Sequence, residues 1–482
     1  MIASADLRNP WRWYLALLLV GAVVSLVDGS PLLKFQAQRI TEVLLATGLL
    51  AWCFRPQPRS FFESPLASGW YGLGLVGFAA VGLLAGAAGP VPWISLGFLG
   101  LALLQFSLLP LLRQAWSEHR SDTERLLALF AVALVGIELG IWLVTHVHGV
   151  APYSWVNRLL PSGEVFSVPY LFLNSRWANQ CSVLLLWTFV PLLAQLQSGH
   201  IRLWRGFWWV ICIAVPLLCL GQIMLTQGDG GFLATALATA VMALLAWRGD
   251  QTRRRLYVTA IVMLAVGAAV AGLLSVALSD GSFVGEMVQR NAAELQNATR
   301  PSGNRLFNWL TFVRTTFASP IWGVGIHAVP KGATLCSPHN IWLGLLYWTG
   351  LLGTASAVLL ASGFVPRQLK SAQLSPMAAP LLVSLFAYQL VDDIWLRPLA
   401  LALLLVILPG LLPDGADQSW PVPLRLAPLL HRFSFPAVSY RFAALLGLLM
   451  IVVSVIVPGG VGFQPSPLVA LPELGKGCLL FF

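Results

Sequence analysis

The sequence predicts an all-α polytopic membrane protein with about twelve transmembrane helices, and three observations support this fold class. Of the 482 residues, 57% are hydrophobic and only 10% are charged, whereas a soluble domain carries about 25% charged residues. The mean hydropathy is +0.78. Apolar runs of roughly 17–25 residues recur along the chain, and each is long enough to cross about 30 Å of hydrocarbon as a helix. The strands of a membrane barrel would instead alternate over about ten residues.

The apolar runs divide the chain into three parts. We expect residues 1–278 to hold transmembrane helices one to nine, residues 279–338 to form a long outer loop with amphipathic helices, and residues 339–482 to hold the remaining helices. The first run follows Arg8 and Arg12 and lacks a small-residue cleavage site, so we expect a retained helix and not a signal peptide. The expected helices cover residues 14–29, 40–54, 70–88, 92–112, 126–146, 181–197, 207–226, 232–247, 256–278, 340–363, 376–391 and 396–412, with a thirteenth candidate at 442–458.

Positive charge sets the expected orientation of these helices. The net charge is +10, and the basic residues concentrate in short segments between apolar runs, as at 253–255. This distribution is typical of cytoplasmic loops and does not indicate a nucleic-acid surface. With the N-terminus inside, the two long segments that fall outside are 147–180 and 279–338. Long ordered loops are usually functional.

The second outer segment contains one amphipathic helix. Apolar residues recur there at helical spacing, at Leu306, Trp309, Leu310, Val313 and Phe317. Pro320 is expected to end the helix. We expect the helix to lie at the outer membrane surface or against the helix bundle. Arg305 falls beside the apolar stripe, so it is a candidate to face inward.

His339 and Asn340 mark the point where polar chain meets the next apolar run. A neutral imidazole can accept a proton from an acceptor hydroxyl, and a positioned base of this kind raises a rate by roughly 10²- to 10⁴-fold. The start of a helix disfavours the imidazolium form, which suits this role. The alternative is a histidine that caps the helix or lies in a wet interface. Asn340 would supply a second polar group at the same entrance.

Four arginines run against the rule that outer segments carry little positive charge. They are Arg176, Arg290, Arg305 and Arg314. A guanidinium binds phosphate in a bidentate fork, and such charge-assisted hydrogen bonds contribute about 1.5–3 kcal/mol each. A pyrophosphate group at the outer face would suit them. The alternative is that some of them extend toward solvent or pair with acids of the same loop.

Two acidic positions are further candidates. Asp392 closes an apolar run at the outer side, with Arg397 five residues later. It is a candidate to orient His339 or to bind a sugar hydroxyl, and the alternative is an Asp–Arg pair or a solvated helix end. Glu138 lies inside the fifth expected helix, and an acid within a membrane is a functional candidate by default. Its partner cannot be named from the sequence.

No metal or cofactor site is predicted. His146 and His148 have no third ligand nearby, so an interfacial polar cluster is the favoured interpretation. The six cysteines form no metal-binding pattern. Cys181 and Cys336 both fall on the outer side, where a disulfide and two unpaired thiols are both open alternatives.

The order of several short motifs resembles the signature of the O-antigen ligase and polymerase superfamily. The residues that carry the resemblance are Ser302-Gly303-Asn304-Arg305, then Trp309, Pro320 and Gly323-Val324-Gly325, then His339-Asn340 with Gly350 and Gly353. The family has Gly directly before its Arg, whereas Asn304 separates the two here. Many members also carry a Ser-Arg after the helix expected at 207–226, where this chain has Gln227-Gly228-Asp229-Gly230. Arg176 or Arg290 would then substitute for that arginine.

The resemblance implies a GT-C-like glycosyltransferase that needs no metal or cofactor. Such enzymes take a glycan from undecaprenyl pyrophosphate on the periplasmic side of the bacterial inner membrane, and the ligase branch transfers it to the lipid A–core of lipopolysaccharide, with inversion. By position, Arg305 matches the family arginine, His339 the family histidine, and Asp392 an acid in a later helix. The implied partners are these two lipid-linked glycans and membrane lipids.

Three other functions remain open at this stage. An O-antigen polymerase and a protein O-oligosaccharyltransferase share the same motifs. A transporter or flippase for a lipid-linked substrate belongs to another class, and broken helices in two matching halves would favour it. The sequence contains no such pairing.

Overall fold

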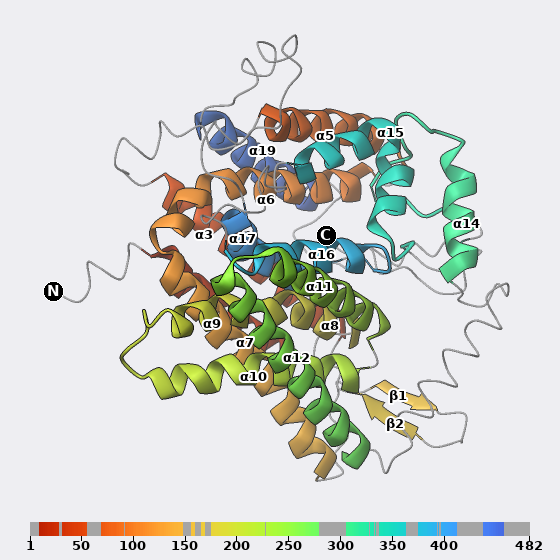
Figure 1. The fold of residues 1–482 in the computed structure, drawn as a ribbon. Helices are drawn as coiled ribbons and strands as arrows, with labels where there is room; N and C mark the ends of the chain where they lie inside the picture. The colour runs from red at the N-terminus through yellow and green to blue at the C-terminus, as the bar shows by residue number, and fades with distance from the viewer. Residues whose placement is uncertain are drawn as a thin grey trace. The chain divides into compact units, whose positions relative to one another are not determined.

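The computed structural model of the protein (Figure 1) is dominated by helices, as the sequence predicts. It describes residues 9–27, 31–54, 69–90, 92–147, 156–159, 165–168, 175–226, 228–278, 305–326, 328–331, 333, 337–362, 375–392, 394, 397–411 and 437–456. Arg290 and Cys336, both of which the sequence analysis singles out, lie outside these residues.

Every apolar run of the sequence contains a helix. The helices are α2 Pro10–Val27, α3 Pro31–Cys53, α5 Gly69–Ala88, α6 Pro92–Glu118, α7 Arg120–Val147, α8 Ser175–Leu185, α9 Phe189–Gln197, α10 Arg205–Leu225, α11 Asp229–Arg248, α12 Gln251–Leu278, α14 Arg305–Thr316, α15 Ile341–Ser362, α16 Ala378–Gln389, α17 Pro398–Ile407 and α19 Ala437–Ile456. Two short 3-10 helices, Leu186–Thr188 and Leu408–Leu411, extend α8 and α17.

Eight of the helical segments in the described part of the chain are long and apolar enough to cross a membrane. The protein is therefore a polytopic membrane protein, but the expected count of about twelve spans is reached only in part. The expected spans that are not among the eight include those at α3, α16 and α17. The helices α16 and α17 are short, with 12 and 10 residues, or about 18 and 15 Å at 1.5 Å per residue. The helix α3 contains a buried ion pair, in which Arg39 Nη1 lies 2.6 Å from Glu42 Oε2.

One expectation for the outer segment 147–180 needs correction. The segment is not only a loop, because Val156–Leu159 (β1) and Val165–Val168 (β2) form an antiparallel hairpin that pairs Val156 with Val168. Each strand has four residues, and hydropathy averaged over a membrane-length window does not detect so short an element.

The chain folds as two compact units. The first contains Met1–Glu42, His119–Leu295 and Ser375–Leu404. Within it, α10 packs against α7, α8, α9 and α12, and α11 packs against α12 and α16 (Figure 1). The segment Ala178–Gln197 is the most buried of the candidate spans. Its polar residues explain this position, because a membrane helix turns polar side chains toward protein and away from lipid.

The second unit contains Val43–Glu118, Gln296–Leu374 and Leu405–Phe482. Here α6 packs against α5 and α19, and α15 packs against α5 and α14 (Figure 1). The helices α6 and α19 meet at Gly100 and Gly447, where a Cβ at Gly100 would lie 2.6 Å from the Gly447 carbonyl oxygen. Small residues allow membrane helices to approach this closely.

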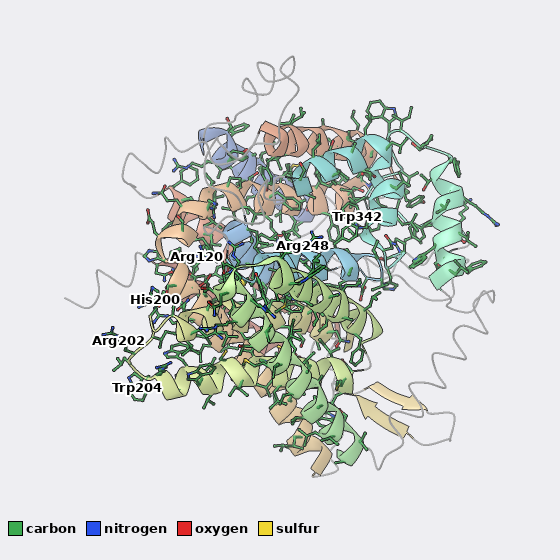
Figure 2. All side chains as sticks on the ribbon, viewed as in Figure 1. Arg120, His200, Arg202, Trp204, Arg248 and Trp342 are labelled. Atoms are coloured by element: carbon green, nitrogen blue, oxygen red, sulfur yellow. The ribbon has the colours of Figure 1, made fainter. Side chains whose placement is uncertain are left out.

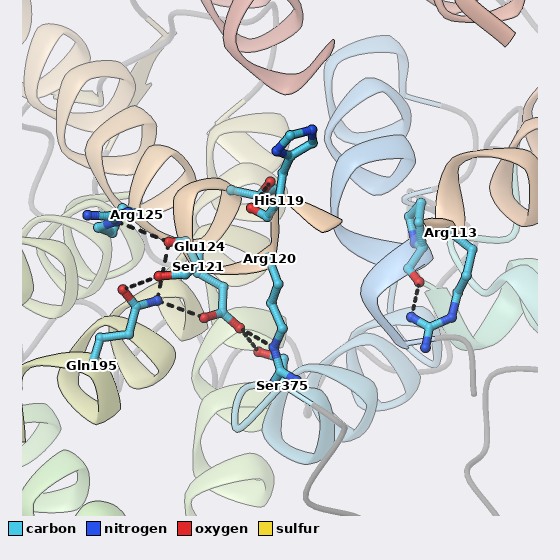
Figure 3. Close-up of polar contacts among 10 residues, drawn as sticks. Arg113, His119, Arg120, Ser121, Glu124, Arg125, Gln195 and Ser375 are labelled. Carbon is cyan, nitrogen blue, oxygen red and sulfur yellow. Dashed lines mark hydrogen bonds and ion pairs between the residues drawn. The ribbon is translucent and has the colours of Figure 1, made fainter. Parts of the chain in front are cut away.

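Polar side chains gather in the first unit at the end predicted to be cytoplasmic (Figure 3). Glu124 is buried and accepts hydrogen bonds from Arg120 Nε at 3.2 Å, Ser375 Oγ at 2.8 Å and Gln195 Nε2 at 2.9 Å. These contacts connect the start of α7 with the end of α9 and with the residues before α16. Because its charge is met by several donors, the burial of this carboxylate is tolerated.

Candidate active site

The helix that follows His339 is broken in the middle. Gly350 has φ 64° and ψ −167°, which divides α15 into two halves. The loop 320–325 occupies the break: Val324 and Gly325 donate their N–H groups to the carbonyls of Tyr347 and Trp348 at 3.1 and 3.0 Å. In the other direction, the N–H groups of Leu351 and Leu352 bond the carbonyls of residues 320 and 321 at 2.8 and 3.2 Å. Every one of these backbone groups at the break is therefore satisfied, as membrane burial requires.

Two glycines permit this crossing of backbones. A Cβ at Gly323 would lie 2.3 Å from the Trp348 carbonyl oxygen, and one at Gly350 would lie 2.3 Å from the Ile321 carbonyl oxygen. Both glycines also have positive φ, which L-residues rarely adopt. The Gly-rich loop of the sequence is thus the element that stabilises the broken helix, a role that the sequence alone did not indicate.

The amphipathic helix α14 lies along the first half of α15 (Figure 1). Trp309 Nε1 donates a hydrogen bond to the carbonyl oxygen of Pro338 at 2.6 Å. One turn further on, the Phe312 ring meets Tyr347 edge-on, with centroids 5.0 Å apart. The helix is therefore attached to α15 both before its start and along its first half.

The face of α14 that packs within the unit coincides only in part with the apolar stripe. Asn308, Phe312 and Thr316 are buried, whereas Leu306, Leu310, Val313 and Phe317 are exposed within the unit. The packed face contains the polar Asn308 and Thr316, and of the expected stripe it includes Trp309, whose indole bonds the Pro338 carbonyl. The exposed apolar stripe suits the alternative that the helix also rests on a membrane surface.

His339 occupies a tight turn directly before α15. Its φ of 50° places it in the left-handed region, which costs an L-residue roughly 1–2 kcal/mol, although histidine adopts it more often than most. The backbone N–H of His339 donates to Ser337 Oγ at 3.1 Å. Asn340 caps the helix, because its Oδ1 accepts the N–H of Leu343 at 3.1 Å. The capping role that the sequence left open for His339 is thus performed by its neighbour.

The predicted arginines occupy different situations. Position 305 begins α14 and shares one stripe with the buried positions 308, 312 and 316, because these lie three or four residues apart. Arg314 is exposed, and at about 100° per residue it lies roughly opposite position 305. Arg176 is the second residue of α8.

Asp392 belongs to the first unit, where it is buried just beyond α16. The preceding residue, Val391, packs on the start of α11, since a Cβ at Gly230 would lie 2.7 Å from Val391 Cγ2. A Cβ at Gly228 would likewise lie 2.4 Å from Asn179 Nδ2 of α8. Gly228 and Gly230 belong to the turn where this chain lacks the Ser-Arg of the family that it resembles. This turn therefore packs against the residue before Asp392 and against α8, the helix that contains Arg176.

Glu138 has a partner that the sequence did not reveal. Its Oε2 accepts a hydrogen bond from Gln222 Nε2, and Gln222 Oε1 accepts one from Ser182 Oγ at 2.5 Å. All three side chains are buried, and they connect α7, α8 and α10. Gln222 and Ser182 are polar residues within apolar runs, which was the signal available for finding them.

The described residues add no further candidate from cysteine or metal chemistry. Cys181 is a free, buried thiol. Among the residues that the structure describes, no three His, Cys, Asp or Glu side chains gather as metal ligands would.

These features define a polytopic membrane protein in which a histidine-bearing turn begins a broken helix. An amphipathic helix packs on the first half of that helix, and a Gly-rich loop pairs with its break. Residues 214–358 match the family described as O-antigen ligase, which confirms the resemblance predicted from the sequence. Proteins of this family are membrane glycosyltransferases of the ligase or polymerase kind. The match covers less than half of the chain; it includes Arg305 and His339 and ends before Asp392. No curated protein matches the chain.

Proposed function

We propose that the protein is an O-antigen ligase of the periplasmic face of the bacterial inner membrane. It would transfer a glycan from undecaprenyl pyrophosphate to the lipid A–core of lipopolysaccharide. The observation that carries this proposal is the hydrogen bond from Trp309 to the Pro338 carbonyl. It holds the helix that begins at Arg305 against the residue that precedes His339, so a phosphate-binding group and a base can act on one substrate.

The reaction is a single displacement. The acceptor hydroxyl oxygen attacks the anomeric carbon while the bond from that carbon to the pyrophosphate oxygen breaks, which inverts the configuration. His339 takes the hydroxyl proton, and Arg305 stabilises the negative charge that develops on the departing pyrophosphate. Asn340 supports His339 by fixing the start of α15. Asp392 is proposed to bind a sugar hydroxyl, and Arg176 and Arg290 are proposed as additional pyrophosphate ligands.

The main rivals differ in acceptor or in class. A polymerase or a protein O-oligosaccharyltransferase would use the same donor and base with a second lipid-linked glycan or a protein hydroxyl as acceptor. A transporter would use broken helices to expose backbone groups to its substrate. The break in α15 does not suit that use, because the loop 320–325 already pairs with the backbone groups around Gly350.

The first prediction tests His339 as the base. In His339→Ala, transfer from a lipid-linked donor to lipid A–core should fall by roughly 10²-fold or more, whereas donor binding should persist because the arginines carry it. Both are measured on purified protein. Normal transfer by a well-folded variant would remove the base from this mechanism, and loss of both folding and binding would indicate a structural histidine.

A further inference from the structure

The two polar groups of a single peptide bond are both held in place immediately before His339. The peptide that joins Pro338 to His339 contains the Pro338 carbonyl and the His339 N–H. The carbonyl accepts the hydrogen bond from Trp309 Nε1 at 2.6 Å, and the N–H donates to Ser337 Oγ at 3.1 Å. Both ends of the peptide plane are therefore fixed, one by α14 and one by the turn itself.

The orientation of this peptide decides the conformation of His339. The φ of His339 is the rotation about the bond that joins this peptide to the Cα of His339, so a change in φ alone turns the imidazole relative to the peptide and to α14. The φ of His339 is 50°. This value is unfavourable for an L-residue, and it persists only where the surrounding structure imposes it. If the carbonyl lost its bond to the indole, φ of His339 would be free to return to a negative value without an equal and opposite change in ψ of Pro338. The imidazole would then point in another direction relative to α14.

We infer that Trp309 is a positioning residue that holds the Pro338–His339 peptide, and thereby the imidazole of His339, in the orientation needed for proton transfer. This inference rests on the proposed function of His339. The same hydrogen bond fixes α14, and position 305 lies four residues before Trp309 on the same side of that helix. One indole N–H therefore sets the position of the base and of the helix that bears the pyrophosphate-binding arginine.

The substitution Trp309→Phe tests the inference, because it removes the N–H and keeps an aromatic ring. We expect kcat to fall about tenfold or more, since a small misplacement of a catalytic group is enough for such a loss, while the KM for the donor stays within about twofold. Ser337→Ala, which releases the other end of the peptide, should lower kcat in the same way. The matched control is Trp322→Phe, because the Trp322 side chain is exposed and its indole makes no hydrogen bond within the described part of the chain; it should keep the wild-type kcat.

A double-mutant cycle shows whether Trp309 acts through His339. In the His339→Ala background, Trp309→Phe should cause a clearly smaller loss of kcat than in the wild type, because the base is no longer there to be positioned and only the effect on α14 remains. An equal loss in both backgrounds would overturn the inference and indicate a general structural role. Wild-type kcat in Trp309→Phe, with His339→Ala impaired, would overturn the inference and leave the proposed function intact. Wild-type transfer by His339→Ala would remove both.

Discussion

Arg305 and Arg314 carry the same charge on the same short helix, yet they occupy opposite sides of it. Position 305 shares the packed stripe that contains Phe312, and Arg314 is exposed. The charge pattern in the sequence treated the two alike, because both break the positive-inside rule. The geometry separates them, since only position 305 lies on the side of α14 that meets the residues before α15.

Charge-conserving substitutions should therefore affect the two arginines differently. Arg305→Lys should lower glycan transfer about tenfold or more, because an ammonium cannot form the bidentate fork with a pyrophosphate. Arg314→Lys is the matched control and should stay within about twofold of wild type. Transfer rates are compared at saturating and limiting donor. Equal effects of the two substitutions would show that the side of α14 does not matter, and the pyrophosphate site should then be sought at Arg176 or Arg290.

At the scale of the element, the broken helix shows where sequence reasoning ends. The existence of α14 and the start of α15 near residue 340 could be predicted, because apolar periodicity and the onset of an apolar run are local signals. The break at Gly350 could not, since one glycine leaves the hydropathy of the run unchanged. The groups that satisfy the break come from the loop 320–325, some 30 residues earlier in the chain. Hydrogen bonds between segments so far apart in the chain leave no local sequence pattern from which they could be predicted.

The same reason explains why the packed face of α14 could not be predicted. Apolar periodicity finds a stripe but not the surface against which it packs, and the buried face includes Asn308 and Thr316. Likewise, Trp309 was recognised as part of a motif, but its indole N–H finds its acceptor 29 residues later. The candidate residues were therefore accessible from sequence, whereas the contacts that orient them were not.

Substitution of Gly350 should show how much the break contributes to stability. Gly350→Ala adds a Cβ that would lie 2.3 Å from the Ile321 carbonyl oxygen and forces a positive φ on alanine. We expect a loss of at least about 2 kcal/mol in the free energy of unfolding, seen as a lower Tm of the purified protein in detergent. The control is Gly140→Ala in α7, where nothing lies within 4 Å of the added Cβ and alanine favours a helix by up to about 1 kcal/mol. A wild-type Tm in Gly350→Ala would mean that the loop 320–325 is not locked into the break.

At the scale of the whole molecule, the proposed chemistry depends on which ends of the helices face the periplasm. The turn before α10 offers one marker, because Arg202 and Trp204 project from it with exposed side chains beside His200 (Figure 2). Arginine and tryptophan together are typical of a membrane interface, and the arginines indicate the cytoplasmic side. Lys331, in the loop that follows α14, is also exposed, and it marks the side that we expect to be periplasmic.

Labelling of single cysteines at these two markers tests the orientation. With the six native cysteines replaced, Lys331→Cys should react with a membrane-impermeant maleimide added to intact spheroplasts. Arg202→Cys should react only after the membrane is permeabilised, because the charge distribution places it inside. Both sites are exposed, so a difference in reactivity reports sidedness and not burial. The reverse pattern would place His339 and α14 on the cytoplasmic side, where a periplasmic donor cannot reach them, and the ligase mechanism would then fail as a whole.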